Sequence, residues 1–261
     1  MVWTPLVFYG AIPLMLPGSH SSPTFSPLYR QIKSLILQGL ESGEWRPGDA
    51  IPSENELATR FSVSQGTVRK AIDEMAAENL LIRRQGKGTY VASHNDSDQL
   101  TKVRFLRLMP DNGKLEIPQN VPLECWRAKA GQEASRILGI HLGAPITIIR
   151  RLLKFVGKPV VVDEIYLPGE IFTGITLEML QDYQGSFYGL LESHFGVRMV
   201  RAEERLRAIA ADRPNAALLG VGEGAPLLSI ERVSYTYGDR PVEWRRGLYL
   251  TTEHYYLNKL G

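Results

Sequence analysis

Apolar residues recur at helical spacing over residues 26–42, SPLYRQIKSLILQGLES, and predict an amphipathic helix. Ser26 is a suitable N-cap, Pro27 fits the first helical position, and Gly43 is expected to end the helix. Its apolar face consists of Leu28, Ile32, Leu35, Ile36 and Leu40.

Two shorter helices are expected in residues 53–79, which begin with SENELATRFSVSQGTVRK. Ser53 and Glu56 have the spacing of a capping box, so the first of these helices begins there. Its core face is formed by Leu57 and Phe61. Ser64 is expected to cap the other helix, which runs to about Asn79. The inward face of this helix is formed by Val68, Ile72 and Met75.

A hairpin and a linker are expected after these helices. Residues 80–92, LLIRRQGKGTYVA, predict two short strands joined at Gly86-Lys87-Gly88, where glycines allow a tight tip. The polar run SHNDSDQ follows and predicts a loop. We therefore expect one domain over 26–92 and a linker over 93–119.

Long alternating strands dominate beyond residue 120 and predict an α+β domain built on an antiparallel sheet over residues 120–261. The expected strands and helices are a hairpin of 145–155 with 158–168, a helix at 186–196, a strand at 197–210, a helix at 212–221 and a hairpin within 225–250 that turns at Gly238-Asp239.

The apolar residues 1–25 are interrupted by Pro5, Gly10, Pro13 and Pro17, so they do not predict a membrane helix. No Lys or Arg precedes Arg30, which argues against a secretory signal. We expect a disordered extension with no membrane role. Two alternatives remain open: a start of translation further along, at Met15, or an apolar arm that packs on a partner.

Composition narrows the class of protein. A chain of 261 residues can form two domains, and its net charge of +2 is uninformative unless the basic residues cluster. The one cysteine, Cys125, excludes an internal disulfide and fits a reducing compartment. The five histidines have no metal-ligand spacing. We expect a cytoplasmic protein with no metal and no cofactor.

The residues that open the third helix suit contact with DNA. In a helix-turn-helix the second helix enters the major groove with its N-terminal residues at the base edges. Gln65 can pair bidentately with adenine, and Arg69 with guanine or a phosphate. The candidate DNA contacts in helices and hairpin are Asn55, Ser64, Gln65, Gly66, Thr67, Arg69, Lys70, Arg84, Gln85, Gly86 and Lys87.

The alternative is an ordinary solvated face, because residues 24–95 hold 9 Lys and Arg against 8 Asp and Glu. The arrangement favours DNA, since the basic residues occur in the third helix and the hairpin. The acidic residues Glu41, Glu44, Glu54 and Glu78 are expected to lie elsewhere.

The segment PLYRQIKSLI…PGDAIPSENELATRFSVSQGTVRKAI…NLLIRRQGKGTYV resembles the winged helix-turn-helix of the GntR family of bacterial transcription regulators. The resemblance implies binding of double-stranded DNA. Asn55 and Gln65 stand where the family commonly has Arg or Lys, and Gly66 replaces a bulkier residue, whereas Arg69 is kept. We therefore expect a base preference different from that usual in the family.

Polar residues in the second half lie among apolar ones. Glu204 shares a strand face with Val200, Ala202, Leu206 and Ala208, and Glu243, Arg245 and Tyr249 share another face, opposite Val242, Trp244 and Leu248. An exposed sheet face or an edge salt bridge is the alternative for each.

The runs RRLLKFVGKPVVVDEIYLP, SFYGLLESHFGV and PVEWRRGLY resemble the UTRA effector domain of HutC-type GntR regulators, which is similar in fold to chorismate lyase. The resemblance implies ligand contacts at Arg151, Asp163, Ser186, Glu243 and Tyr249, to which we add Glu204. A shifted register would place Glu164 instead of Asp163 beside Arg151. Leu153 occupies a position where the family often has Arg, so a phosphosugar ligand does not follow.

An enzyme is the alternative class of protein. Glu203 and Glu204 are adjacent in a strand and point to opposite faces, so they cannot share a substrate. No catalytic triad, phosphate-binding glycine loop or activated cysteine is evident, and Cys125 is expected to be a core or hinge thiol.

The sequence thus predicts a ligand-responsive transcription regulator and not an enzyme. We expect a repressor that binds a two-fold operator as a homodimer and is released by a small molecule, a carboxylate or a sugar derivative. An architectural DNA binder without an effector remains the third alternative.

Overall fold

In a computed structural model of the chain, residues 26–95, 107–114 and 117–258 are described. The expected disordered extension, residues 1–25, lies outside them. Among the described helices none is long and apolar enough to cross a bilayer.

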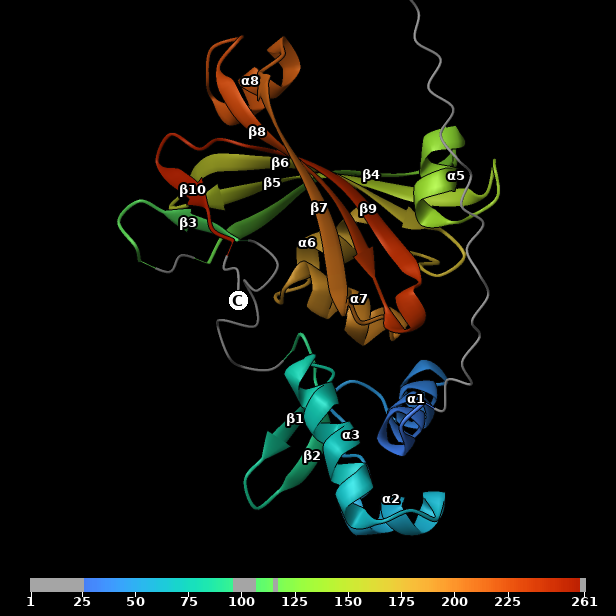
Figure 1. The fold of residues 1–261 in the computed structure, drawn as a ribbon. Helices are drawn as coiled ribbons and strands as arrows, with labels where there is room; N and C mark the ends of the chain where they lie inside the picture. The colour runs from blue at the N-terminus through green and yellow to red at the C-terminus, as the bar shows by residue number, and fades with distance from the viewer. Residues whose placement is uncertain (1–25, 96–106, 115–116, 259–261) are drawn as a thin grey trace, which may run out of the picture.

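The N-terminal part is a three-helix unit followed by a two-stranded hairpin (Figure 1). Its elements are α1 (Leu28–Glu41), α2 (Glu54–Phe61), α3 (Gln65–Ala77), β1 (Leu81–Arg84) and β2 (Gly88–Val91). Burial of the apolar faces holds them together, because Ile36, Leu57, Val68, Ile72 and Met75 are all fully buried in one cluster.

The expected helix caps hold for two of the three helices. Ser53 and Glu56 form the capping box of α2, and the Ser64 side chain accepts from the Thr67 amide at the start of α3. The cap predicted for α1 is wrong, because Pro27 occupies the N-cap position and no side-chain cap bond forms. The carbonyl of Ser26 instead accepts from the Gln31 side chain.

Two apolar residues of α1 do not join the core. Leu28 and Leu35 are exposed, whereas Ile32, Ile36 and Leu40 are buried. The helical period is therefore correct, but the core face is narrower than the apolar stripe.

The C-terminal part is built on a six-stranded antiparallel sheet with the order β4-β5-β6-β9-β8-β7. Its strands are β4 (Gln119–Lys129), β5 (Pro145–Phe155), β6 (Lys158–Pro168), β7 (Arg201–Ala210), β8 (Pro226–Tyr235) and β9 (Pro241–Tyr249). A separate pair is formed by β3 (Leu108–Pro110) and β10 (His254–Tyr256).

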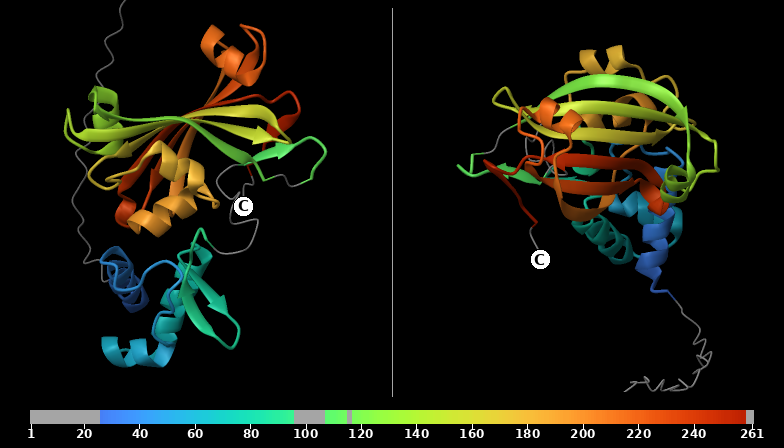
Figure 2. Two further views of the ribbon diagram at one scale, coloured as in Figure 1. Left: turned by 180° about the vertical axis from the view of Figure 1, so that it is seen from behind. Right: turned by 90° about the horizontal axis from the view of Figure 1, so that it is seen from above.

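Helices cover both faces of this sheet (Figure 2). One face packs on α6 (Leu177–Asp182) and α7 (Phe187–Phe195), and we call it the inner face. At the two ends of the opposite, outer face lie α5 (Gln132–Leu138) and α8 (Arg213–Leu219).

Both predicted long hairpins form, and the second turns through a short 3-10 helix, η1 (Tyr237–Asp239). The strand expected over 197–210 begins only at Arg201, in β7. The sequence reading did not identify β4, α5 or α6. Short strand β3 lies inside the segment expected to be a linker, and its pairing with β10 joins that segment to the end of the chain.

Candidate nucleic-acid interface and small-molecule cavity

The polar start of α3 is exposed on the side of the N-terminal unit that faces away from the large sheet (Figure 1). Ser64, Gln65, Gly66, Arg69 and Lys70 are all exposed there. The neighbouring Thr67 is half-buried, and Asn55 is exposed on α2. The amides of a helix N-terminus favour an anion, so this surface suits a phosphate backbone.

The β1–β2 hairpin presents a thin basic tip. Gly86 and Gly88 have φ values of +69° and +105°, which only glycine adopts readily, so the chain can reverse within a few residues. Gln85 and Lys87 are exposed at this tip, and the guanidinium of Arg84 lies 4.5 Å from the centre of the Tyr90 ring. A narrow cationic hairpin of this kind fits a groove of DNA.

One acidic residue does not lie where it was expected. The carboxylate of Glu54, at the first turn of α2, accepts from Gln65 Nε2 at 3.3 Å, Arg69 Nε at 2.9 Å and Arg83 Nη1 at 2.9 Å. Burial alone would raise its pKa, but the hydrogen bonds from Arg83 and Arg69 outweigh burial and lower it. Glu54 is thus an ionised part of the surface around the start of α3.

A cavity of about 440 Å³ opens between the inner face of the sheet and the loop that joins α6 to α7. Arg151, Arg232 and Arg245 contribute to its wall, together with Ser186 and Tyr188 at the start of α7. The Ser186 hydroxyl caps α7 by accepting from the Gly189 amide.

The three cavity arginines are held by carboxylates behind them. Arg151 donates to Asp163 Oδ2 from Nε at 3.0 Å and from Nη2 at 2.7 Å, and Arg245 Nη1 reaches the same oxygen at 3.3 Å. Arg245 also donates from Nε to Glu243 at 2.7 Å. Arg232 donates from Nε to Glu204 at 2.7 Å. The network is therefore neutral in sum, with its positive groups at the cavity.

Burial makes this network strongly coupled, because Asp163 and Glu243 are completely inaccessible to solvent. Burial by itself would raise the pKa of both carboxyls. For Asp163 the guanidinium groups of Arg245 and Arg151 outweigh burial and hold the pKa below its usual value. For Glu243 the same is done by Arg245 and Arg232. Both groups are carboxylates in the folded protein.

Gly247 of β9 provides the space that this network needs. A Cβ atom there would lie 2.5 Å from the Tyr249 ring and 2.8 Å from Asp163 Oδ1. Because residue 247 has no side chain, the Tyr249 ring and the Asp163 carboxylate can lie over this position on the inner face.

Six of the seven residues proposed as effector contacts line the cavity or lie on the inner face, and the seventh, Glu164, does not. Arg151 and Ser186 line the cavity. Asp163, Glu243, Tyr249 and Glu204 lie on the inner face near or behind the arginines, and the first three are buried. The residues that the sequence reading did not select are Asn120, Tyr188, Arg232 and Arg245. Arg245 could have been chosen from the sequence, because strand alternation places it on the same face as Glu243.

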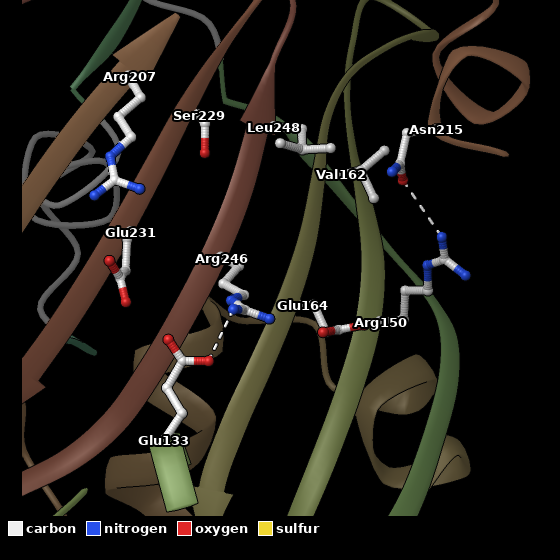
Figure 3. Close-up of a pocket in the computed structure, with 10 residues that line it drawn as sticks. All are labelled: Glu133, Arg150, Val162, Glu164, Arg207, Asn215, Ser229, Glu231, Arg246 and Leu248. Carbon is white, nitrogen blue, oxygen red and sulfur yellow. Dashed lines mark hydrogen bonds and ion pairs between the residues drawn. The ribbon is translucent and has the colours of Figure 1, made fainter. Parts of the chain in front are cut away.

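Glu164 lies on the outer face, because the hairpin register pairs Asp163 with Arg151 and Glu164 with Arg150. Arg150, Glu164, Arg246 and Glu231 are direct cross-strand partners in four adjacent strands, so their charges alternate. Figure 3 shows them around a second cavity of about 350 Å³, where Arg246 also pairs with Glu133 of α5 at 3.0 Å. Cross-strand pairs of opposite charge stabilise a sheet.

The inner cavity suits a charged ligand better than the outer one. Its arginines are only 3–5% exposed, so water screens little of their interaction with an anion. Arg246 and Glu133 on the outer face have side chains that are 50% and 51% exposed, and solvent weakens such pairs.

Cys125 is partly buried and packs against the cluster beneath α6 and α7, in agreement with a core thiol. Within the described ranges no three His, Cys, Asp or Glu side chains gather as metal ligands.

The two parts of the chain match two families. Residues 28–91 match the bacterial regulatory proteins of the gntR family, and residues 118–255 match the UTRA domain. The repressor NagR of Bacillus subtilis is 28% identical over 224 residues, which cover 85% of this chain and 90% of NagR.

Solved structures agree with these matches. The ligand-binding domain of a protein from Bordetella bronchiseptica, described as a GntR-family transcriptional regulator, is 50% identical with a TM-score of 0.60; the match covers 60% of this chain and 98% of that domain. PhnF from Mycobacterium smegmatis is 25% identical with a TM-score of 0.52, and the match covers 88% of this chain and 99% of PhnF.

Replacing Gly247 with alanine should lower the free energy of unfolding of the C-terminal domain by roughly 1–3 kcal/mol, because the new methyl group overlaps the Tyr249 ring and Asp163. Urea unfolding followed by tryptophan fluorescence measures this. Gly222→Ala is the control, since nothing lies within 4 Å of its Cβ position. Equal stability of the two variants would contradict the packing described.

Acid should destabilise the sheet network. The lowered pKa values of Asp163 and Glu243 mean that their contribution is fully present above the unfolded-state value of about 4 and is lost as the pH falls through the folded-state values. The free energy of unfolding of Asp163→Asn should therefore fall less steeply between pH 5 and pH 3 than that of the wild type. Glu223→Gln, at an exposed position, is the control for the loss of a carboxyl group as such.

Proposed function

The chain belongs to the gntR family of bacterial regulatory proteins and carries a UTRA domain, and we propose that it is a repressor which a small-molecule effector releases from a two-fold symmetric operator. The family consists of DNA-binding transcription regulators, so the protein is not an enzyme. We propose further that it acts in the cytoplasm as a homodimer. The arginine-lined cavity of the C-terminal domain carries this proposal, in one chain with the three helices and β1–β2 hairpin of the N-terminal part, which we call the winged unit.

The winged unit would bind one half-site. The start of α3 would enter the major groove, with Gln65 and Arg69 at base edges and Ser64 and Thr67 at phosphates. The tip around Lys87 would lie against the neighbouring minor groove. Asn55, Gln65 and Gly66 support an operator different from that usual in the family. A dimer would match two such half-sites.

The effector would place an anionic group against the cavity arginines. Arg151 donates from Nη1 to Asn120 Oδ1 at 3.3 Å, and both residues line the cavity. Guanidinium groups recognise carboxylate and phosphate oxygens by paired hydrogen bonds. A carboxylate or an acidic sugar derivative is therefore the chemical class that we propose. That NagR is a repressor supports repression as the mode of action.

Residues 93–95, which follow the β1–β2 hairpin (the wing), would transmit the effect of ligand binding to the winged unit. Glu192 of α7 accepts from the backbone amide of His94 at 3.0 Å, and the His94 ring lies 5.5 Å from that of Tyr188. Asn95 accepts from the hydroxyl of Tyr183 at 3.0 Å. Tyr183 and Tyr188 both line the cavity. A ligand that moves these tyrosines would shift the winged unit, provided that it binds the two arrangements with different affinity.

DNA binding is tested with substitutions in α3 and the wing. Arg69→Ala should weaken operator binding about tenfold or more, because it removes a base or phosphate contact. Lys87→Ala should weaken binding less and lower the salt slope by about one. Lys158→Ala, at the exposed first residue of β6, is the control. Unchanged binding by both variants in a salt-titrated shift assay would contradict the assignment.

Effector binding is tested with a thermal-shift screen of the full chain against sugar phosphates, carboxylates and amino-acid catabolites. For the compound that stabilises the protein, Asn120→Asp should lower the affinity about tenfold or more, because the new carboxylate faces the ligand's anionic group. The matched control is Asn215→Asp in the outer cavity, which should leave the affinity unchanged. Loss of affinity in the control alone would assign the ligand to the outer face instead.

A further inference from the structure

Glu54 joins all three elements of the DNA-facing surface. It belongs to α2, whereas Gln65 and Arg69 belong to α3 and Arg83 to β1. Its carboxylate accepts from all three of these side chains, and Arg83 is held in addition by Asp73 of α3, from Nη2 at 2.7 Å. The Glu54 side chain is 15% exposed, so these contacts are poorly replaced by water.

The carboxylate fixes which way round the Gln65 amide lies. An ionised carboxylate only accepts hydrogen bonds, so it can be met by the amide nitrogen but not by the amide oxygen. The lowered pKa of Glu54 keeps it ionised at neutral pH. With Nε2 directed at Glu54, the remaining N–H and the oxygen Oε1 of the exposed Gln65 are left for another partner.

A donor and an acceptor side by side are what adenine requires. In the major groove adenine offers the N7 acceptor and the N6 amino donor, and an amide side chain matches both. Guanine offers two acceptors there and leaves the amide oxygen without a donor. An amide that could rotate by 180° would present its nitrogen and oxygen in either order. It would therefore discriminate less between adenine and the other bases.

The same carboxylate orients Arg69. Glu54 binds Arg69 through Nε, so the two terminal nitrogens of the guanidinium remain available on the exposed side. Those nitrogens form the fork that reads guanine or grips a phosphate. Without Glu54 the half-exposed side chain of Arg69 loses its described ion-pair partner.

We propose that Glu54 is a specificity-determining positioning residue, which holds the Gln65 amide in the orientation that reads adenine. The proposal rests on the proposed DNA-binding function and names what one residue contributes to it. Glu54 does not contact the base itself. It acts through Gln65, and its carboxylate charge opposes the phosphate backbone, so removal should reduce selectivity more than affinity.

Selection from a randomised operator library with the full chain tests this. Glu54→Gln should lower the preference for adenine at one position of each half-site at least about fivefold, the lower end of what one bidentate side chain contributes. Binding to random DNA at low salt should stay equal or become tighter. Gln65→Ala should lose the preference at the same position, and Glu54→Gln should then add nothing in the Gln65→Ala background. A purely structural role would lower binding in both backgrounds.

The controls separate this proposal from the one on which it rests. Glu44→Gln removes a more exposed carboxylate that also pairs with an arginine, Arg60, and it should leave the base preference unchanged. If Arg69→Ala abolishes binding while Glu54→Gln or Gln65→Ala retains the adenine preference within twofold, the role of Glu54 is wrong. If Arg69→Ala binds the library as the wild type does, the DNA-binding function itself fails.

Discussion

The central constraint on the C-terminal domain is the mutual neutralisation of arginines and carboxylates on the inner face of its sheet. Removing such groups from water costs several kcal/mol per ion, so they are tolerated only when each has a partner with good geometry. Asp163 receives two arginines, Arg151 and Arg245, from strands on either side of its own. This pairing requires one register between β5 and β6, and a shift by one residue would leave charges buried alone. The arginines of this network line the cavity beside the start of α7.

The two faces of the sheet show how burial changes the role of the same residue types. On the outer face, arginines and glutamates alternate across the strands and are partly exposed, which adds modest stability. On the inner face the same groups lie in a low-dielectric setting, where a guanidinium interacts strongly with any anion that enters. Arg150 and Arg151 are neighbours in sequence and lie in these two different settings.

A similar arrangement recurs in the winged unit, where Glu54 holds side chains that face outward. In both places a carboxylate holds side chains that we propose to contact a ligand. At the start of α3 the surface is exposed, so the effect concerns orientation more than stability. Between the two places, residues 93–95 bind α7 beside two tyrosines of the cavity wall.

Local patterns determined most of the fold: the α2 and α3 caps, the wing and both long hairpins follow from short-range spacing that each segment carries by itself. Alternation also placed Glu243, Arg245 and Tyr249 on one face. Whether that face was buried depended on α6 and α7 packing over it, and the choice between Asp163 and Glu164 depended on register. Glu54, expected to lie apart from the basic residues, contacts them because α2 and α3 cross. Contacts between residues far apart in sequence are made only by packing, so tertiary structure alone decided the cavity, the buried network and the partners of Glu54.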